Sequence, residues 1–290
     1  MFGQQLKQLL EVLDIETLDT DLFRGGSPRT GRDRIFGGQV MAQSLVAAHR
    51  TVEDRLAHSF HCYFLRPGDP ERPILFRVER TRDGRSFTSR RVTAHQRGEV
   101  ILDLAVSYHA HETGLEHQLE AAPPGEPEGV LYEDEIKAMV ERQQGPIERD
   151  DRRFDLPIEV RTLGGLRMFD GEVRAPRTET WMRTKGPLPD DPALHQALLA
   201  YASDLTLLVS AVNPHPVGMT TPGFRSASLD HAMWFHAPFR TDEWLFCDQE
   251  SPVTGAGRGF ALGRFFTREG RLVATCTQEG LVRYRPDEGS

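Results

Sequence analysis

The stretch Phe64-Leu65-Arg66-Pro67 ends a strand-like segment, and Phe235-His236-Ala237-Pro238 ends another one 171 residues further on. Two more turns return at nearly the same distance, Gly84-Arg85-Ser86-Phe87 as Gly257-Arg258-Gly259-Phe260 and Gly98-Glu99-Val100-Ile101 as Gly270-Arg271-Leu272-Val273. Any two antiparallel segments share some turn residues. Because three matches fall at nearly one offset, however, the sequence predicts a duplicated unit.

Each unit is predicted to contain one apolar helix and a run of antiparallel strands. Helices are expected over residues 4–14, from Phe36 to about His49 and from Ala193 to Val212, with strands over 59–110 and 226–284. An apolar helix lying on a curved antiparallel sheet is an α+β layer architecture. We predict an N-terminal repeat over residues 1–115, a linker over 116–150 with a surface helix from Glu133 to Gln144, and a C-terminal repeat over 151–290.

The composition is that of a globular protein, with 38% hydrophobic and 27% charged residues. A net charge of −8 argues against a protein that mainly binds nucleic acid. The three cysteines, Cys62, Cys247 and Cys276, lie in apolar runs without zinc-binding spacing, which predicts free thiols in a reducing compartment. The sequence shows neither a signal peptide core nor a membrane span. We therefore expect a cytoplasmic protein with no membrane or nucleic-acid partner.

Two patterns fail as ligand sites. Gly255-Ala256-Gly257-Arg258-Gly259 is similar to a dinucleotide-binding loop, but Phe260 takes the place of the last glycine and a strand is expected next. Phosphate binding by such a loop needs a helix at that point. Three histidine pairs, His58/His61, His109/His111 and His231/His236, are not accompanied by convincing carboxylate or thiolate ligands. We expect neither a metal nor a cofactor.

Asp204 is the most informative single residue. On a continuous helix, at about 100° per residue, it shares a face with apolar side chains within about 60° on either side: Ala197, Ala200, Tyr201, Leu207, Leu208 and Ala211. A buried, unpaired charge is costly. Burial also raises the pKa of a carboxyl toward the range of a general base. The sequence leaves two interpretations, a general base or a cap for a neighbouring strand or loop.

Three other polar residues bear on this interpretation. Gln43 lies on the apolar face of the first helix at a place comparable to that of Asp204, which suggests a first repeat without the base. Gln278 alternates with Ala274 and Cys276 on one face of a strand, and a buried amide needs partners. The hydroxyl of Ser228 can both donate and accept a hydrogen bond. By pattern alone it is one serine among several.

Several longer motifs occur in a fixed order along the chain. The first half has Phe36-Gly37-Gly38-Gln39-Val40, His58-Ser59-Phe60-His61 running into Tyr63-Phe64-Leu65-Arg66-Pro67-Gly68-Asp69, and Arg82-Asp83-Gly84-Arg85-Ser86-Phe87. The second half has Tyr201-Ala202-Ser203-Asp204-Leu205, Leu229-Asp230-His231 with Met233-Trp234-Phe235-His236, and Gln278-Glu279-Gly280. Over nearly its whole length the chain resembles the acyl-CoA thioesterase II family, which has a double hot-dog fold.

The resemblance implies three catalytic residues, all in the C-terminal repeat. The catalytic aspartate of the family falls on Asp204 and its catalytic glutamine on Gln278. Ser228 stands where the family commonly has threonine. This difference keeps the hydroxyl and drops a methyl group, so it bears on positioning and rate more than on the type of reaction.

The expected reaction is the hydrolysis of acyl-CoA thioesters to a free fatty acid and coenzyme A. Asp204 would take a proton from water, while Ser228 and Gln278 would hold that water at the carbonyl. One alternative is an enoyl-thioester hydratase or dehydratase, which would want a histidine on the face of Asp204. The other is a non-catalytic acyl-CoA-binding protein, which measured turnover would exclude.

Arginine is strongly preferred over lysine, 32 residues against 3. Five arginines gather around one predicted turn: Arg80, Arg82, Arg85, Arg90 and Arg91. A guanidinium suits the phosphates of coenzyme A. Charges at a strand edge also prevent aggregation, so both interpretations stay open.

The second half is rich in large aromatic side chains: Trp234, Phe235, Trp244, Phe246, Phe260, Phe265 and Phe266. Burial of one helix needs fewer, and the alternative is that all belong to the core. Apolar surface left uncovered by the chain is usually buried by a partner subunit. On this ground the sequence predicts a homo-oligomer, a dimer of double hot-dogs or a higher multiple.

Static light scattering at micromolar concentration tests this prediction. An oligomer has a mass that is a multiple of the 32.7 kDa of one chain. A stable mass close to that of one chain would reject it.

Overall fold

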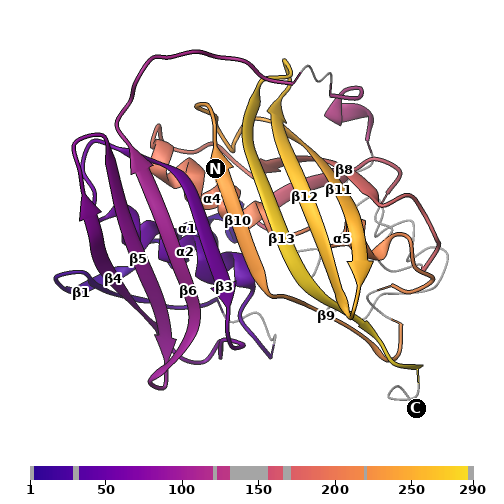
Figure 1. Ribbon diagram of the computed structural model, residues 1–290, viewed down its shortest axis with the longest axis horizontal. Coiled ribbons are helices and arrows are strands. Elements are labelled where there is room, and N and C mark those ends of the chain that lie inside the picture. Colours follow the sequence, from indigo (N-terminus) through magenta and orange to yellow (C-terminus); the bar gives the residue numbers. More distant parts are fainter. Residues whose placement is uncertain are drawn as a thin grey trace.

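The computed structural model describes residues 3–28, 33–119, 123–130, 156–165, 171–218 and 221–286. Its strands form one 13-stranded antiparallel sheet (Figure 1). They are β1 (Glu16–Asp19), β2 (Leu22–Gly25), β3 (Leu56–Phe64), β4 (Ile74–Asp83), β5 (Phe87–Gln96), β6 (Glu99–His109), β7 (Ile158–Thr162), β8 (Arg177–Thr184), β9 (Phe224–Ser228), β10 (Asp230–Phe235), β11 (Leu245–Gly255), β12 (Arg258–Thr267) and β13 (Leu272–Tyr284).

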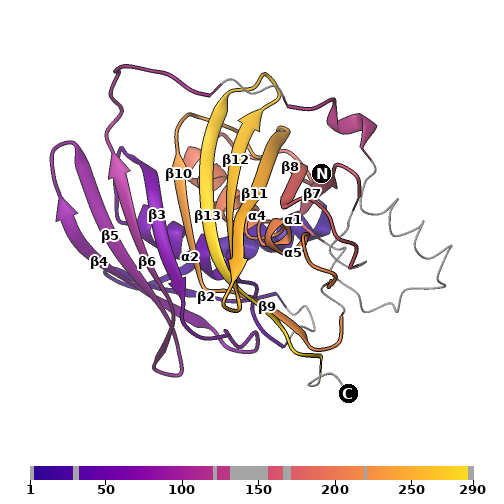
Figure 2. The same ribbon diagram turned by 45° about the vertical axis from the view of Figure 1, so that its right-hand side comes forward.

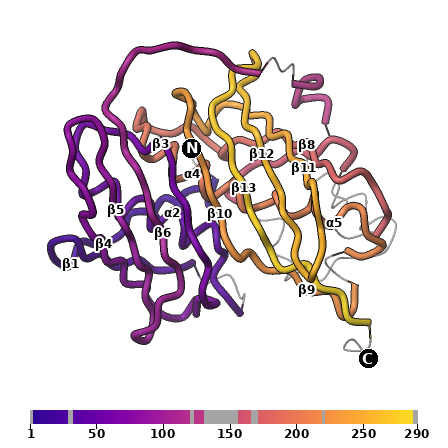
Figure 3. Tube along the Cα trace, viewed as in Figure 1, coloured from indigo at the N-terminus to yellow at the C-terminus, as the bar shows by residue number. Residues whose placement is uncertain are grey.

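The two halves of the sheet meet at β3 and β10. The strand order is β1-β2-β4-β5-β6-β3-β10-β13-β12-β11-β8-β7, and β9 pairs with β13 beside this path. Phe60 of β3 lies opposite Met233 of β10, and both are fully buried. The trace in Figure 3 shows the strands of the first half of the chain on one side of this junction and those of the second half on the other. Pairing of the two central strands therefore fixes how the repeats face each other.

The helices lie on the inner side of the curved sheet (Figure 2). They are α1 (Gln4–Leu13), α2 (Gly37–His49), α4 (Pro192–Ser203) and the single turn α5 (Val209–Val212), with a 3₁₀ turn at Pro127–Gly129. Helices α2 and α4 pack against each other, and the ring of Phe36 meets that of Tyr201 edge-on at 5.1 Å. With sheet around them and a helix beside them, almost all residues of both are buried. This arrangement is the predicted α+β fold of two repeats.

The single long helix expected from Ala193 to Val212 is wrong. Helix α4 begins at Pro192, capped by the Asp191 carboxylate, and ends at Ser203. The Ser203 hydroxyl donates to the Ala200 carbonyl, and such bonds compete with the helical ladder. Asp204 is therefore the C-cap residue of α4 and not a position on the face of a continuous helix.

Gln43 is not the counterpart of Asp204. It lies in the middle of α2, where its Nε2 donates to the carbonyls of Val12 and Gly26. Its amide ties the helix to the last turn of α1 and to the segment that follows β2. The C-cap residue of α2, the position that Asp204 holds on α4, is Arg50.

Of the seven aromatic side chains named above, Phe235, Trp244, Phe246, Phe265 and Phe266 are buried, while Trp234 and Phe260 are half-buried. Trp181, Trp244, Phe246 and Phe266 make a buried cluster, and Val130 and Leu163 pack against it. The chain itself thus covers the rings of this cluster, which therefore give no support to the predicted homo-oligomer. The oligomer stays a prediction. The three cysteines are buried and free, as predicted.

The remaining predictions concern four strands, one helix and membrane spans. Strands β1, β2, β7 and β8 were not predicted, and the helix expected from Glu133 to Gln144 lies outside the described residues. Among the residues that are described, no helix is long and apolar enough to cross a bilayer.

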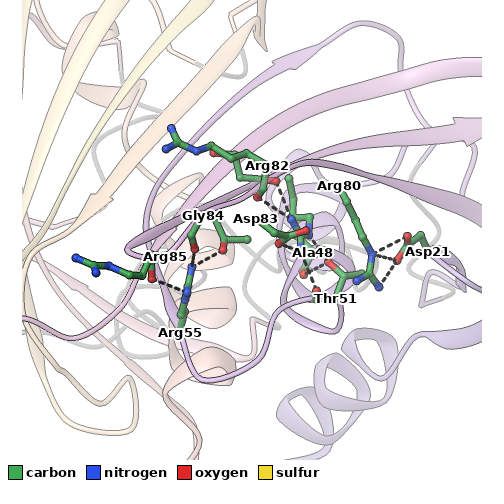
Figure 4. Close-up of polar contacts among 12 residues, drawn as sticks. Asp21, Ala48, Thr51, Arg55, Arg80, Arg82, Asp83, Gly84 and Arg85 are labelled. Atoms are coloured by element: carbon green, nitrogen blue, oxygen red, sulfur yellow. Dashed lines mark hydrogen bonds and ion pairs between the residues drawn. The ribbon is translucent and has the colours of Figure 1, made fainter.

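Most arginines of the predicted cluster form hydrogen bonds or ion pairs with other residues of the protein, part of which Figure 4 shows. Figure 4 shows Arg80 paired with Asp21. The exposed Arg91 pairs with Asp103. Arg90 is 3% exposed; its guanidinium donates to the hydroxyl and carbonyl of Thr51 and to Asp83. The donors of these three side chains already have acceptors within the protein. Arg90 and Arg91 lie on β5, which pairs with β4 and β6 and is not an edge strand, so protection of a strand edge does not account for them.

Adjacent arginines of β5 give a matched test. Arg90→Met should lower the free energy of unfolding in urea by about 3 kcal/mol, because buried hydrogen bonds to a charged group are lost. Arg91→Met should cost less than about 1 kcal/mol, because an exposed ion pair contributes little. Equal losses in the two variants would contradict this account of the cluster.

Candidate active site

The three residues implied by the resemblance lie together. Gln278 Nε2 donates to Asp204 Oδ1 at 2.5 Å and to Ser228 Oγ at 2.8 Å. Ser228 Oγ donates to the same Asp204 Oδ1 at 3.1 Å. An amide, a hydroxyl and a carboxylate thus form one closed set of hydrogen bonds.

Strand pairing positions the amide and the hydroxyl. The 13-residue strand β13 is long enough to pair with both β10 and β9. Ser228 is the last residue of β9 and lies opposite Gly280, two residues beyond Gln278. Gln278 points inward and is 1% exposed. Its Oε1 is buried and accepts no hydrogen bond from the described residues.

The first turn of α2 provides a fourth hydrogen-bonding group of the site. The backbone N–H of Gly38 donates to the Asp204 carboxylate. A Cβ on Gly37 would lie 3.0 Å from Asp204 Oδ2 and 2.9 Å from the Phe64 ring, so only glycine leaves room for this approach. The N-terminal end of a helix favours negative charge. The analysis of single residues missed this contact, although Phe36-Gly37-Gly38 carried part of the resemblance.

The surroundings tune the carboxyl group of Asp204. Burial raises its pKa from the ordinary 3.8 to about 6, while the hydrogen bonds from Gln278, Ser228 and Gly38 act in the opposite direction. Asp204 is therefore mostly ionised at pH 7. It is also a stronger base than an ordinary aspartate, and this combination suits a group that accepts a proton from water.

The buried histidine of this region is bonded to another residue. His231 Nε2 and Ser203 Oγ are 3.0 Å apart, and burial lowers the pKa of His231 to about 3. The ring is therefore neutral at pH 7, and no hydrogen bond joins it to Asp204. Among the described residues, no group of His, Cys, Asp or Glu side chains is arranged to hold a metal ion.

A double helix-and-sheet repeat with a carboxylate, a hydroxyl and an amide at one end of its helix pair defines a hot-dog protein with a polar site. Two family models match the chain, acyl-CoA thioesterase N-terminal domain over residues 26–109 and acyl-CoA thioesterase over residues 147–281. Acyl-CoA thioesterase 2 of Haemophilus influenzae is 38% identical over 96% of this chain and 98% of its own length. Human acyl-coenzyme A thioesterase 8 is 37% identical over 95% of this chain and 88% of its own.

Solved structures agree with these relatives. The crystal structure of the acyl-CoA thioesterase II TesB2 from Mycobacterium marinum superposes with a TM-score of 0.77, at 41% identity over 96% of this chain and 99% of that one. A hot-dog protein from Alicyclobacillus acidocaldarius shares the fold, with a TM-score of 0.75 at 20% identity. The chain belongs to the acyl-CoA thioesterase family and is an acyl-CoA thioesterase of the double hot-dog fold.

The raised pKa of Asp204 predicts the pH dependence of the reaction. The base is active only when deprotonated, so kcat/KM should be low at pH 5, rise with a midpoint near pH 6 and reach a plateau above it. Steady-state kinetics with one acyl-CoA measure this profile. The residual activity of Asp204→Asn should lack the midpoint. A wild-type profile that is flat between pH 5 and pH 8 would contradict the assignment.

Proposed function

We propose that the chain hydrolyses acyl-CoA thioesters by direct attack of a water molecule that Asp204 activates. The observation that carries the proposal is the closed set of hydrogen bonds among Asp204, Ser228 and Gln278 at the N-terminal end of α2. A buried carboxylate held in this way has its reactive oxygens fixed before the substrate arrives, which lowers the entropic cost of the reaction.

The steps balance without an acyl-enzyme. Asp204 takes one proton from water while the water oxygen forms a bond to the thioester carbon, and the carbonyl oxygen becomes an oxyanion. The oxyanion collapses, the C–S bond breaks, and the thiolate of coenzyme A leaves with the bonding electrons. Protonated Asp204 returns its proton to that sulfur. The products are a fatty acid and coenzyme A, and Asp204 is again ionised.

Ser228 and Gln278 are positioning residues for the water in this proposal. The Ser228 hydroxyl donates to Asp204 and accepts from Gln278, so a single rotamer satisfies both. Its second lone pair can accept a hydrogen bond from the water. The positive end of the α2 dipole lies beside the reacting centre, where it stabilises negative charge on the oxyanion.

The geometry does not favour a hydratase or dehydratase. Those reactions need a general acid beside the aspartate, and His231 is bonded to Ser203 and is neutral at pH 7.

We also propose that the enzyme acts in the cytoplasm, since its three cysteines are free. The test of the proposed function is release of coenzyme A thiol from short, medium and long acyl-CoAs by the purified protein.

Three variants test the roles of the residues in the same assay. Asp204→Asn should stay folded and lose about 10²–10⁴-fold in kcat, the usual contribution of a general base. Ser228→Ala should lower kcat, while Ser228→Thr should keep much of it because the hydroxyl remains. Circular dichroism confirms folding. Near-normal turnover by folded Asp204→Asn would reject the base, and equal rates for the Ala and Thr variants would show that Ser228 is a bystander.

A further inference from the structure

A cavity lies at the other end of the helix pair. It has a volume of about 1380 Å³, and the residues that line it include Leu56, Ala57, Pro192, His195, Gln196 and Ala237. Pro192 is the first residue of α4, whereas Asp204 follows its last residue, so the helix separates the cavity from the site described above by about 18 Å. In Figure 1 the segment after β6 passes over the cavity end of the sheet, and β9 lies at the opposite end.

Strand register places Ala57, which lines this cavity, at the position equivalent to that of Ser228. Ser228 lies opposite Gly280, and Ala57, 171 residues before Ser228, lies opposite Tyr108. The ladder irregularity at Ala57 in β3 corresponds to the break between β9 and β10 after Ser228. The first residues of one helix and the end of one strand therefore border each site. At the cavity these are Pro192 of α4 and Ala57 of β3.

The catalytic side chains have no chemical equivalents at this second position. Ala57 stands in the place of Ser228, and Arg50 is the C-cap of α2 as Asp204 is of α4. Val106 lies opposite Arg90, as Gln278 lies opposite Ala261 in the other repeat, so Val106 stands in the place of Gln278. Apolar side chains thus replace the hydroxyl and the amide, and the arginine in place of the base is bonded to Asp14 and to the Ile15 carbonyl, so the three catalytic groups are not repeated here.

Two buried polar atoms of the cavity lining nevertheless lack partners. His195 Nδ1 accepts from the backbone N–H of Thr241, and burial lowers the pKa of the ring, so the neutral ring carries its proton on Nε2. Neither that Nε2 nor Gln196 Oε1 has a hydrogen-bond partner among the described residues. The two side chains are 2% and 5% exposed. One donor and one acceptor on adjacent residues complement an amide, which has one of each.

Two of the arginines that line the cavity, Arg55 and Arg271, form no ion pair with a carboxylate of the described residues, whereas Arg268 pairs with Glu126 and Glu128. Arg240 pairs with Asp190 and Asp242, and Arg183 with Glu159. By contrast, the hydrogen bonds of Arg55 within the described residues go to neutral oxygens, the carbonyls of Gly84 and Arg85 and the hydroxyl of Thr88 (Figure 4). The guanidinium fork is the protein group best suited to phosphate.

We propose that the cavity is a second, non-hydrolysing site that binds the coenzyme A moiety of substrate or product. The volume accommodates a large ligand, the unpartnered donor and acceptor match a pantetheine amide, and Arg55 at the mouth matches a phosphate. The choice of ligand rests on the proposed function, since a duplicated unit that binds acyl-CoA in one copy retains the same framework in the other. The cavity itself does not depend on that function.

Equilibrium dialysis with a non-hydrolysable thioether analogue of an acyl-CoA tests the proposal. Wild-type protein should bind two analogues per chain at concentrations well above saturation of the catalytic site. Ala237→Trp, which fills the cavity, and Leu56→Trp, at its mouth, should each bind one while keeping thiol release at low substrate. Leu75→Trp is the matched control for the second variant, because Leu75 is 40% exposed against 41% for Leu56 and does not line the cavity. It should bind two.

Coenzyme A alone, the second probe, should also bind twice to wild type and once to Ala237→Trp. One analogue per chain in wild type, or two in both cavity variants, would overturn the proposal. Twofold binding of the analogue without twofold binding of coenzyme A would overturn the assignment to the coenzyme A moiety. Failure of the proposed function gives a different result, namely no thiol release by wild type at any chain length.

Discussion

The contact between the Asp204 carboxylate and the first turn of α2 is the interaction on which the site depends. It joins the two repeats, because the carboxylate ends the helix of one repeat and the N–H group that holds it begins the helix of the other. Gly37 and Gly38 make the close approach possible, since a side chain at either position would meet Asp204, Phe64, Phe36 or Tyr201. The site therefore requires both repeats to be folded and docked.

Duplication explains why one chain has two such ends and one set of catalytic groups. The paired central strands, β3 and β10, place each helix so that its first turn faces the last turn of the other. At one end the facing groups are Asp204, Ser228 and Gln278. At the other end Ala57 and Val106 replace the polar groups, and the buried Arg90 binds Thr51 just beyond α2. The two ends therefore carry different side chains on the same backbone framework.

Much of this arrangement is predictable from local pattern, and the errors arise from contacts distant in sequence. Periodicity and paired glycines predicted α2 and most of the strands correctly, and the three polar residues do lie together. The end of α4 was missed because no Gly or Pro marks it, and His231, the partner of Ser203, lies 28 residues away. The role of Gln43 depends on carbonyls from two other segments. The aromatic cluster was misjudged because Val130, from the linker, and Leu163 cover it.

The central claim is that water attacks the thioester directly and that Asp204 only moves its proton. A single turnover in water enriched in ¹⁸O, with enzyme in excess over acyl-CoA, tests this claim most directly. The account predicts one ¹⁸O atom in the fatty acid from the first turnover and none in the peptide that contains Asp204, both read by mass spectrometry. A first-turnover fatty acid without ¹⁸O, followed by ¹⁸O in Asp204, would show that the carboxylate itself attacks, and would contradict the account.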